Sequence, residues 1–152
     1  MKINVLSIAK EQKNLYEDTV KELSKMIGKF AKIEDKNLFN SKVTNAQNQG
    51  RDHSQAIYAD LYEPYLNKGY NIVLHPNAKE LDSFEFSKLL SDRMSVQFFI
   101  GGAHGFNEPF VKKCDRSISL SKLTMSHKVA KVVLFEQIFR GLSILNNHPY
   151  HK

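Results

Sequence analysis

An apolar run that stops on glycines constrains the fold of this chain more than any other stretch. Val96–Ile100, with the sequence VQFFI, combines β-branched and aromatic residues, which predicts a strand buried on both faces. Gly101 and Gly102 end this strand, and Gly105 turns the chain again. Glycine leaves backbone N–H and C=O groups open to a ligand, and α/β folds bind ligands at the carboxyl edge of the parallel sheet.

The same glycines also fit a plain turn between a strand and a helix, which is the alternative for this stretch taken alone. A dinucleotide fingerprint is disfavoured here. The pattern G-x-G-x-x-G needs glycine at Ile100, and it needs an acidic residue roughly 20 positions further on, where Leu120 and Ser121 stand. A nucleoside bound at this turn would therefore be recognised in another way.

Strand-like and helix-like patterns alternate along the whole chain. We expect strands in 2–8, 30–39, 70–75, 96–100 and 117–120, and helices in 13–29, 53–67, 82–93, from 107 onward and in 127–146. This alternation predicts an α/β fold with a mostly parallel sheet and helices on both faces. The 152 residues are typical of one domain.

The polar stretch 40–51, NSKVTNAQNQGR, has almost no large apolar residue, and we expect a mobile surface loop there. Such a loop is either a passive connector or a lid that faces RNA, the latter supported by Lys42 and Arg51.

The chain carries a surplus of basic residues. Lysine and arginine number 22 against 16 acidic residues, which gives a net charge of +6. This surplus favours a polyanionic partner such as nucleic acid. Because the basic residues are scattered, a merely soluble basic surface is the alternative.

The single cysteine, Cys114, excludes a disulfide within the chain and indicates a reducing cytoplasm. We interpret Cys114 as a small buried hydrophobe near a helix end, because no local pattern activates its thiol. The apolar runs are too short to span a bilayer, and the N-terminus lacks the apolar core of a signal peptide. We expect no membrane partner.

The last expected helix, 127–146, is apolar around most of its circumference. Its apolar residues are Val129, Val132, Val133, Phe135, Ile138, Phe139, Leu142, Ile144 and Leu145. A helix of this kind is buried on more than one side. In so small a chain, one side can meet the protomer's own sheet and another a second copy, which predicts a two-fold homodimer.

Two segments carry a family resemblance. FFIGGAHGF at 98–106 and SLSKLTMSHKVAKVVLFEQIFRGLSILNNHPYHK at 119–152 resemble the bacterial ribosomal RNA large-subunit methyltransferase H family, which belongs to the SPOUT class. The glycine turn, the SLSKLT loop and the NHPYH tail form a specific combination. The resemblance is close from about Val96 to the end and looser before it.

The resemblance implies a single SPOUT methyltransferase domain over 1–152, with a trefoil knot within about 70–152. It implies an obligate homodimer in the cytoplasm and S-adenosylmethionine as the methyl donor. It also implies methylation at N3 of a pseudouridine in 23S rRNA, within the assembled 70S ribosome or its large subunit.

The resemblance also implies a donor site built from three strand ends. Its residues would be Leu74, Gly102, Ser121, Lys122, Leu123, Thr124, Met125 and Ser126. Backbone groups would read the adenine edge while Leu74, Leu123 and Met125 pack on its faces. Plain core packing is the alternative for Leu74 and Leu123.

Two residues depart from the family pattern. Ser126 stands where proline is common, which predicts a less rigid loop, and His75 stands where an acidic residue is common, which puts a ribose contact in doubt.

The implied reaction needs alignment of the two partners and removal of a proton from N3. His148 and His151 are candidates to accept that proton, because histidine titrates near neutrality. Tyr150 is a further candidate, which could instead stack on the base or donate to a carbonyl oxygen. Arg140 could bind phosphate or offset charge on the uracil oxygens, or it could form an ion pair with Glu136. Two histidines without further ligands are weak support for a metal, and we expect none.

Two other classes of function remain as alternatives. The basic charge would suit a non-catalytic ribosome-binding or assembly protein. The same sheet edge would also suit an enzyme that acts on a small nucleotide.

Overall fold

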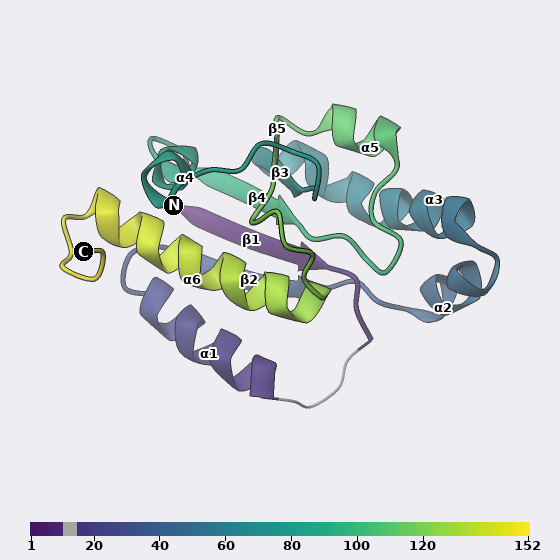
Figure 1. Cartoon of the computed structure of the whole chain (residues 1–152), viewed down its shortest axis with the longest axis horizontal. Helices are drawn as coiled ribbons and strands as arrows, with labels where there is room; N and C mark the ends of the chain where they lie inside the picture. Colours follow the sequence, from purple (N-terminus) through teal and green to yellow (C-terminus); the bar gives the residue numbers. More distant parts are fainter. Residues whose placement is uncertain (11–14) are drawn as a thin grey trace.

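The structure, a computed structural model, describes residues 1–10 and 15–152. A sheet of five strands in the order β2-β1-β4-β3-β5 runs through it, and every neighbouring pair is parallel (Figure 1). The strands are β1 (Lys2–Ser7), β2 (Lys32–Asn37), β3 (Tyr70–Leu74), β4 (Ser95–Phe99) and β5 (Arg116–Ile118). The prediction of a parallel α/β sheet is confirmed.

Helices connect the strands. They are α1 (Leu15–Ile27), α2 (Ser41–Asn48), α3 (Arg51–Tyr62), the 3₁₀ helix η1 (Glu63–Lys68), α4 (Ser83–Leu90), α5 (Glu108–Lys113) and α6 (His127–Leu145). The expected helix over 13–29 starts at residues that lie outside the described part of the chain.

The expectation of a surface loop at 40–51 is wrong, because α2 occupies most of it. The Asn40 side chain caps this helix by accepting hydrogen bonds from the backbone N–H groups of Lys42 and Val43. Only Val43 and Ala46 are buried. A helix that needs so little apolar contact leaves almost no periodic signal in the sequence.

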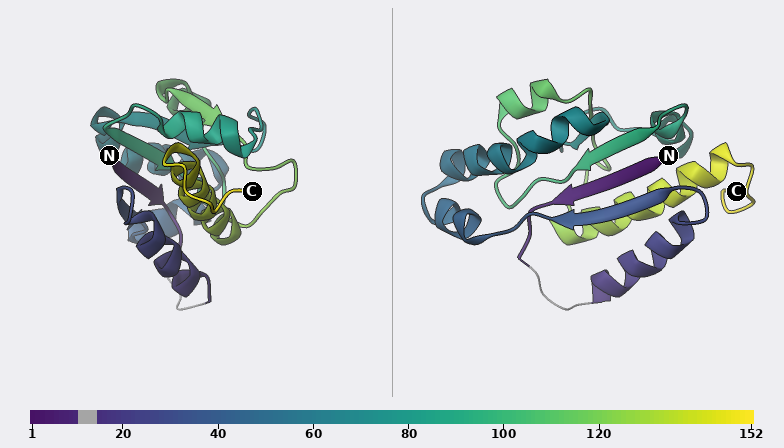
Figure 2. Two further views of the ribbon diagram at one scale, coloured as in Figure 1. Left: turned by 90° about the vertical axis from the view of Figure 1, so that its left-hand side faces the viewer. Right: turned by 180° about the vertical axis from the view of Figure 1, so that it is seen from behind.

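Two apolar cores lie on the two faces of the sheet, as the alternation of side chains in each strand requires. Ile3 and Val5 of β1 point to the face covered by α1, α4 and α6, whereas Leu6 points to the face covered by α2, α3 and α5. Figure 2 shows these two helical layers from the side and from behind. Helices on both faces were predicted, and the structure confirms them.

The two outer strands differ in how they end the sheet. β2 reads KIEDKN, and the carboxylate of Glu34 lies 3.1 Å from Lys2 Nζ and 3.1 Å from Lys36 Nζ. These lysines lower the pKa of Glu34 to about 2. At the other margin, β5 has only three residues.

Helix α6 lies against the sheet between α1 and α4 (Figure 1). Within the described structure, none of its residues before Leu145 is exposed. Burial on more than one side is therefore confirmed, and the protomer's own helices provide both flanks. The half-buried outward face includes Val129, Val133 and Gln137.

The segment that follows β5 runs beside the connection between β3 and α4. Ser119 N–H donates to Lys79 O over 3.0 Å, and Ser119 forms a parallel bridge with Glu80. This crossing is consistent with a knotted C-terminal part, and the knot itself stays a prediction. No helix within 1–10 and 15–152 has the length and apolar character that a membrane crossing requires.

Candidate functional site

A cavity of about 420 Å³ lies at the carboxyl edge of the sheet, where β3, β4 and β5 end. Of the eight residues expected to bind the donor, it brings together seven, namely Leu74, Gly102, Ser121, Leu123, Thr124, Met125 and Ser126. Lys122, the eighth, is exposed and is not part of the cavity wall. Three strand ends thus converge on one space, which is the arrangement that the family resemblance implies.

The glycine turn of this cavity rests directly on helix α3. A Cβ added to Gly102 would lie 2.7 Å from Cζ of the fully buried Tyr58. Gln47 of α2 donates to the Tyr58 hydroxyl over 2.8 Å, which fixes the ring in place. Only glycine therefore fits at this position.

Two further side chains of α3 hold the backbone around the glycines. The buried Tyr62 hydroxyl donates to Ile100 O over 2.5 Å, and burial raises the pKa of Tyr62 well above its usual value. Gln55 donates to His104 O over 2.8 Å. The glycine turn is consequently a preformed wall of the cavity.

The loop from Ser121 to Ser126 is ordered by its own side chains. The backbone N–H of Leu123 donates to Ser121 Oγ over 2.9 Å, and that of Val129 donates to Ser126 Oγ over 3.3 Å. Ser126 is the N-cap of α6 and has φ −60°, a value that proline also adopts. Serine therefore provides a cap at a position whose backbone would accept the family's proline.

The two leucines expected at the donor site differ in burial. Leu123 is 79% exposed, so core packing, the alternative for this residue, is wrong. Leu74 lines the cavity and also packs against the core, so core packing is confirmed for it and donor contact stays a prediction. His75 lines the same cavity, and its Nδ1 accepts a hydrogen bond from the backbone N–H of Asn77 over 3.2 Å.

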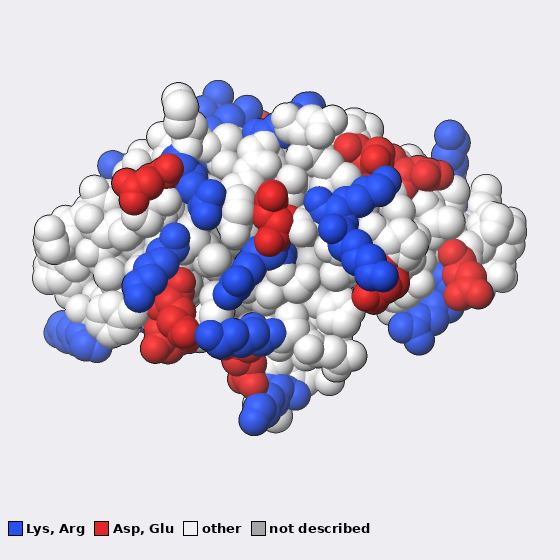
Figure 3. Space-filling model, turned by 90° about the horizontal axis from the view of Figure 1, so that it is seen from above, with Lys and Arg blue, Asp and Glu red and all other residues white. Residues whose placement is uncertain are grey.

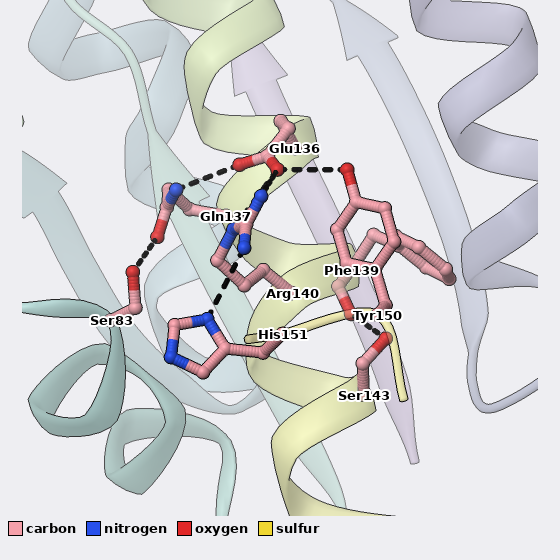
Figure 4. A network of polar contacts seen from close by, with 8 residues as sticks. All are labelled: Ser83, Glu136, Gln137, Phe139, Arg140, Ser143, Tyr150 and His151. Atoms are coloured by element: carbon pink, nitrogen blue, oxygen red, sulfur yellow. Dashed lines mark hydrogen bonds and ion pairs between the residues drawn. The ribbon is translucent and has the colours of Figure 1, made fainter. Parts of the chain in front are cut away.

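The catalytic candidates gather in a second place, at the C-terminal end of α6 (Figure 4). Arg140 donates to Glu136 Oε1 from Nε over 3.0 Å and from Nη2 over 2.5 Å. The Tyr150 hydroxyl donates to the same oxygen over 3.0 Å, and Arg140 Nη1 lies 3.2 Å from His151 Nδ1. Three of the four candidates thus share one network, and the expected ion pair between Arg140 and Glu136 is confirmed.

This network shifts the ionisation of its members. Hydrogen bonding to Glu136 raises the pKa of Arg140, which stays charged in any case. Burial, and then the hydrogen bond to Glu136, raises the pKa of Tyr150. Tyr150 is therefore a neutral hydrogen-bond donor near neutral pH, which suits contact with a carbonyl oxygen better than proton removal.

His148 lies outside this network. Its ring makes edge contacts with Phe30 and Phe139, with centroids 5.7 and 6.2 Å away. His151 instead lies against Phe84, at 4.8 Å. Among the described residues no group of three or more His, Cys, Asp or Glu is placed to hold a metal ion.

Helix α6 separates the two places within one chain. The cavity reaches α6 at its first turn, and Arg140 lies 14 positions after Ser126, or about 20 Å at 1.5 Å per residue. The donor-site residues and the tail residues thus lie toward opposite ends of the same helix (Figure 1). A single protomer does not bring them together.

Sequence reasoning missed several residues of the site. Arg51 lines the cavity, although its stretch was expected to be a loop and was considered only as a possible RNA contact. Gln55, Tyr58 and Tyr62 brace the glycine turn, and helical spacing placed them on a helix without showing what they face. Glu136 was considered only as an ion-pair partner, whereas it also accepts from Tyr150.

Cys114 behaves as the sequence predicted. It is half-buried at the end of α5, and its Sγ lies 3.6 Å from Phe110 O. Burial, and then the nearby Asp115 carboxylate, raises the pKa of its thiol to about 12. A thiol of this kind is no nucleophile at neutral pH.

Known proteins resemble this chain over its full length. It is 51% identical to the ribosomal RNA large subunit methyltransferase H of Aliarcobacter butzleri and 49% identical to that of Campylobacter concisus, with 100% of each chain covered. Among solved structures it resembles Lpg2936 from Legionella pneumophila in complex with the bound cofactor SAM. The TM-score is 0.53 at 12% identity, over 91% of this chain and 65% of that one.

The family model described as "Predicted SPOUT methyltransferase" matches residues 1–151. Together with relatives at about half identity, this match decides the assignment. The chain belongs to the SPOUT methyltransferase family.

Proposed function

We propose that this protein transfers a methyl group from S-adenosylmethionine to N3 of a pseudouridine in 23S rRNA, on the assembled ribosome or its large subunit in the cytoplasm. The whole chain, 1–152, acts as one domain, knotted within about 70–152. The observation that carries the proposal is the cavity in which three strand ends bring together seven of the eight expected donor-site residues. Relatives named for methylation of large-subunit rRNA support the choice of substrate.

The cavity has the properties that an adenosine moiety requires. Its size falls in the range of small-ligand pockets, and Leu74, Leu123 and Met125 offer apolar surface for the faces of a purine. The glycine turn brings backbone without side chains to the cavity wall, which suits close contact with the purine's polar edge. Bound there, S-adenosylmethionine supplies an electrophilic methyl group on sulfur.

The tail residues act on the acceptor base. Arg140, held in a fixed direction by Glu136, stabilises negative charge on the uracil oxygens as N3 loses its proton. Tyr150 donates a hydrogen bond to a carbonyl oxygen or stacks on the base. His148 and His151 are the candidates to accept the proton. His148 lies against Phe30 and Phe139, and the Nδ1 of His151 lies 3.2 Å from Arg140 Nη1.

The active site is composite and belongs to a homodimer. Because the donor cavity and the tail lie about 20 Å apart along α6, a second copy brings its tail to the cavity of the first. The half-buried outward face of α6 and the exposed Phe84 are available for such an interface. A two-fold axis then produces two equivalent sites.

A mixed-dimer experiment tests this proposal. One variant, Thr124→Trp, adds a bulky ring to the exposed loop that lines the donor cavity, and the other ends after Asn147 and lacks the tail. Each is expected to be inactive alone on ribosomes from a strain that lacks the enzyme. When the two variants are unfolded and refolded together, about half of the dimers should be mixed. Each mixed dimer pairs one intact cavity with one intact tail in one of its two sites, so about a quarter of the wild-type activity should return.

The possible results separate the alternatives. No recovery, with mixed dimers confirmed by mass, would show that the tail serves its own chain and would overturn the composite site. Wild-type protein that binds ribosomes but transfers no labelled methyl group would favour a non-catalytic assembly protein. Methylation of free nucleosides would favour the small-nucleotide enzyme.

A further inference from the structure

A second cavity, of about 350 Å³, lies at the carboxyl ends of β1 and β2, between the first turns of α1 and α6. Four lysines and two carboxylates line it, together with His127. The lysines are Lys10, Lys21, Lys128 and Lys131. None of these residues belongs to the donor loop or the tail, and His127 alone lines both cavities.

The floor of this lysine cavity contains an unused polar group. Ser7, at the end of β1, is only 5% exposed, and its Oγ has no hydrogen-bond partner within the described chain. A buried hydroxyl without a partner is rare in folded proteins, because burial without a hydrogen bond is unfavourable. A ligand oxygen in the cavity would satisfy it.

One wall of the lysine cavity is fixed by an ion pair. Lys131 Nζ lies 2.7 Å from Asp35 Oδ1, and the lysine side chain is only 20% exposed. Asn37 closes the rim by exchanging hydrogen bonds with the backbone of Ala9, over 3.1 and 2.6 Å. Because Lys131 neutralises Asp35, three lysines and the single carboxylate of Glu17 remain in the lining, which leaves it with a net positive charge.

The start of α6 is unusual for a helix. Its first turn contains no acidic residue and begins with His127 and Lys128, although cations at a helix N-terminus oppose the helix dipole. Burial and the neighbouring charges of Lys128 and Lys131 lower the pKa of His127. By contrast, α1 has Glu17 and Asp18 in its first turn. An anion bound between the two helices would offset the unfavourable positive charge of His127 and Lys128 at the N-terminus of α6.

We propose that the lysine cavity binds the phosphodiester backbone of the rRNA strand next to the methylated nucleotide. This inference rests on the proposed function, since it assigns a contact to that substrate. Ser7, Lys10 and Lys21 contact phosphate oxygens, and the wall at His127 places this nucleotide directly beside the donor cavity. On the face drawn in Figure 3, by comparison, basic and acidic side chains are interspersed.

The test removes two exposed lysines of the cavity, as Lys10→Ala with Lys21→Ala. The matched control removes two exposed lysines of α5, as Lys112→Ala with Lys113→Ala, so both variants lose the same charge. Binding to large ribosomal subunits from a strain that lacks the enzyme is measured over a series of salt concentrations. The cavity variant should bind about tenfold more weakly, with a salt slope reduced by about 1.4, or about 0.7 for each lost contact.

The control should keep the wild-type slope, and S-adenosylmethionine affinity by calorimetry should be unchanged in both variants. Ser7→Ala, which removes one hydroxyl, should weaken binding by a few-fold without a change in slope. Equal losses in the cavity variant and the control would overturn the lysine cavity as a specific contact. Dissociation of the cavity variant into monomers, with unchanged ribosome binding, would also overturn it, because a partner protomer would then occupy the cavity. Failure of the wild type to transfer methyl groups would instead refute the proposed function.

Discussion

The two ends of helix α6 are built for different tasks. At its start, Ser126 caps the helix and the first turn borders two cavities, one lined by glycine backbone and one by lysines. At its other end, Arg140, Tyr150 and His151 are engaged with one another and with Glu136. The first end offers space and the second offers side chains that are already oriented.

The proposed composite site rests on this difference. In the proposed homodimer, the C-terminal end of one α6 meets the start of another, so that the cavity of one chain receives the tail side chains of its partner. The same comparison predicts which substitutions affect donor binding and which affect only methyl transfer.

Removal of 148–152 should have the largest effect at the C-terminal end. It deletes Tyr150 and His151, which contact Arg140, so methyl transfer should fall to the level measured without enzyme. S-adenosylmethionine affinity, measured by calorimetry, should stay within about twofold, because the donor cavity is about 20 Å away. Normal transfer by the shortened protein would remove the tail from the mechanism.

Gly102→Ala should have the largest effect at the other end. The new Cβ would lie 2.7 Å from the ring of Tyr58, which Gln47 holds in place. We expect a loss of about 1–3 kcal/mol in the free energy of unfolding and at least tenfold weaker donor binding. Gly105→Ala is the comparison, since its Cβ meets nothing within 4 Å and only its φ of +69° is strained. Equal donor affinity in the two variants would contradict the close approach to α3.

Glu136→Gln should affect turnover more than stability. The neutral amide cannot hold both the guanidinium of Arg140 and the hydroxyl of Tyr150 as a carboxylate does, so we expect kcat to fall about tenfold with KM for the donor unchanged. The side chains of Arg140 and Glu136 are 25% and 27% exposed, so the free energy of unfolding should drop by less than about 1 kcal/mol. Glu85→Gln, which loosens an ion pair on α4, serves as the control and should leave kcat unchanged.

His127→Gln should have the smallest effect, visible only in the pH dependence of stability. Burial lowers the pKa of His127 in the folded state below 6.5, so the unfolded chain binds more protons as the pH falls through that value. Wild-type stability should therefore decline below about pH 6.5, by well under about 1 kcal/mol for a group this exposed, and the variant should lack that decline. Chemical denaturation at a series of pH values measures the difference. Identical profiles would indicate that His127 has no shifted ionisation.

The sequence was sufficient to predict the parallel sheet and the convergence of strand ends on one cavity. Buried parallel strands such as Val96–Ile100 are continuous apolar runs, and glycines at their ends place bare backbone at one edge. Helix α2 escaped prediction because Val43 and Ala46 alone anchor it. The shared acceptor Glu136 also escaped, because a contact with Tyr150 across 14 positions depends on how the tail folds back. The periodicity of apolar residues in a sequence does not indicate that a tail folds back onto its own helix.

The charged outer strand β2 has a consequence for how copies of this protein associate. Lys32 and Lys36 of β2 and Lys2 of the neighbouring β1 surround Glu34, and β5 at the opposite margin has only three residues. Growth of the sheet from chain to chain, the first step toward fibrils, is therefore blocked on both sides. Self-association through the helical layer, as proposed above, would give a closed pair rather than an open-ended aggregate.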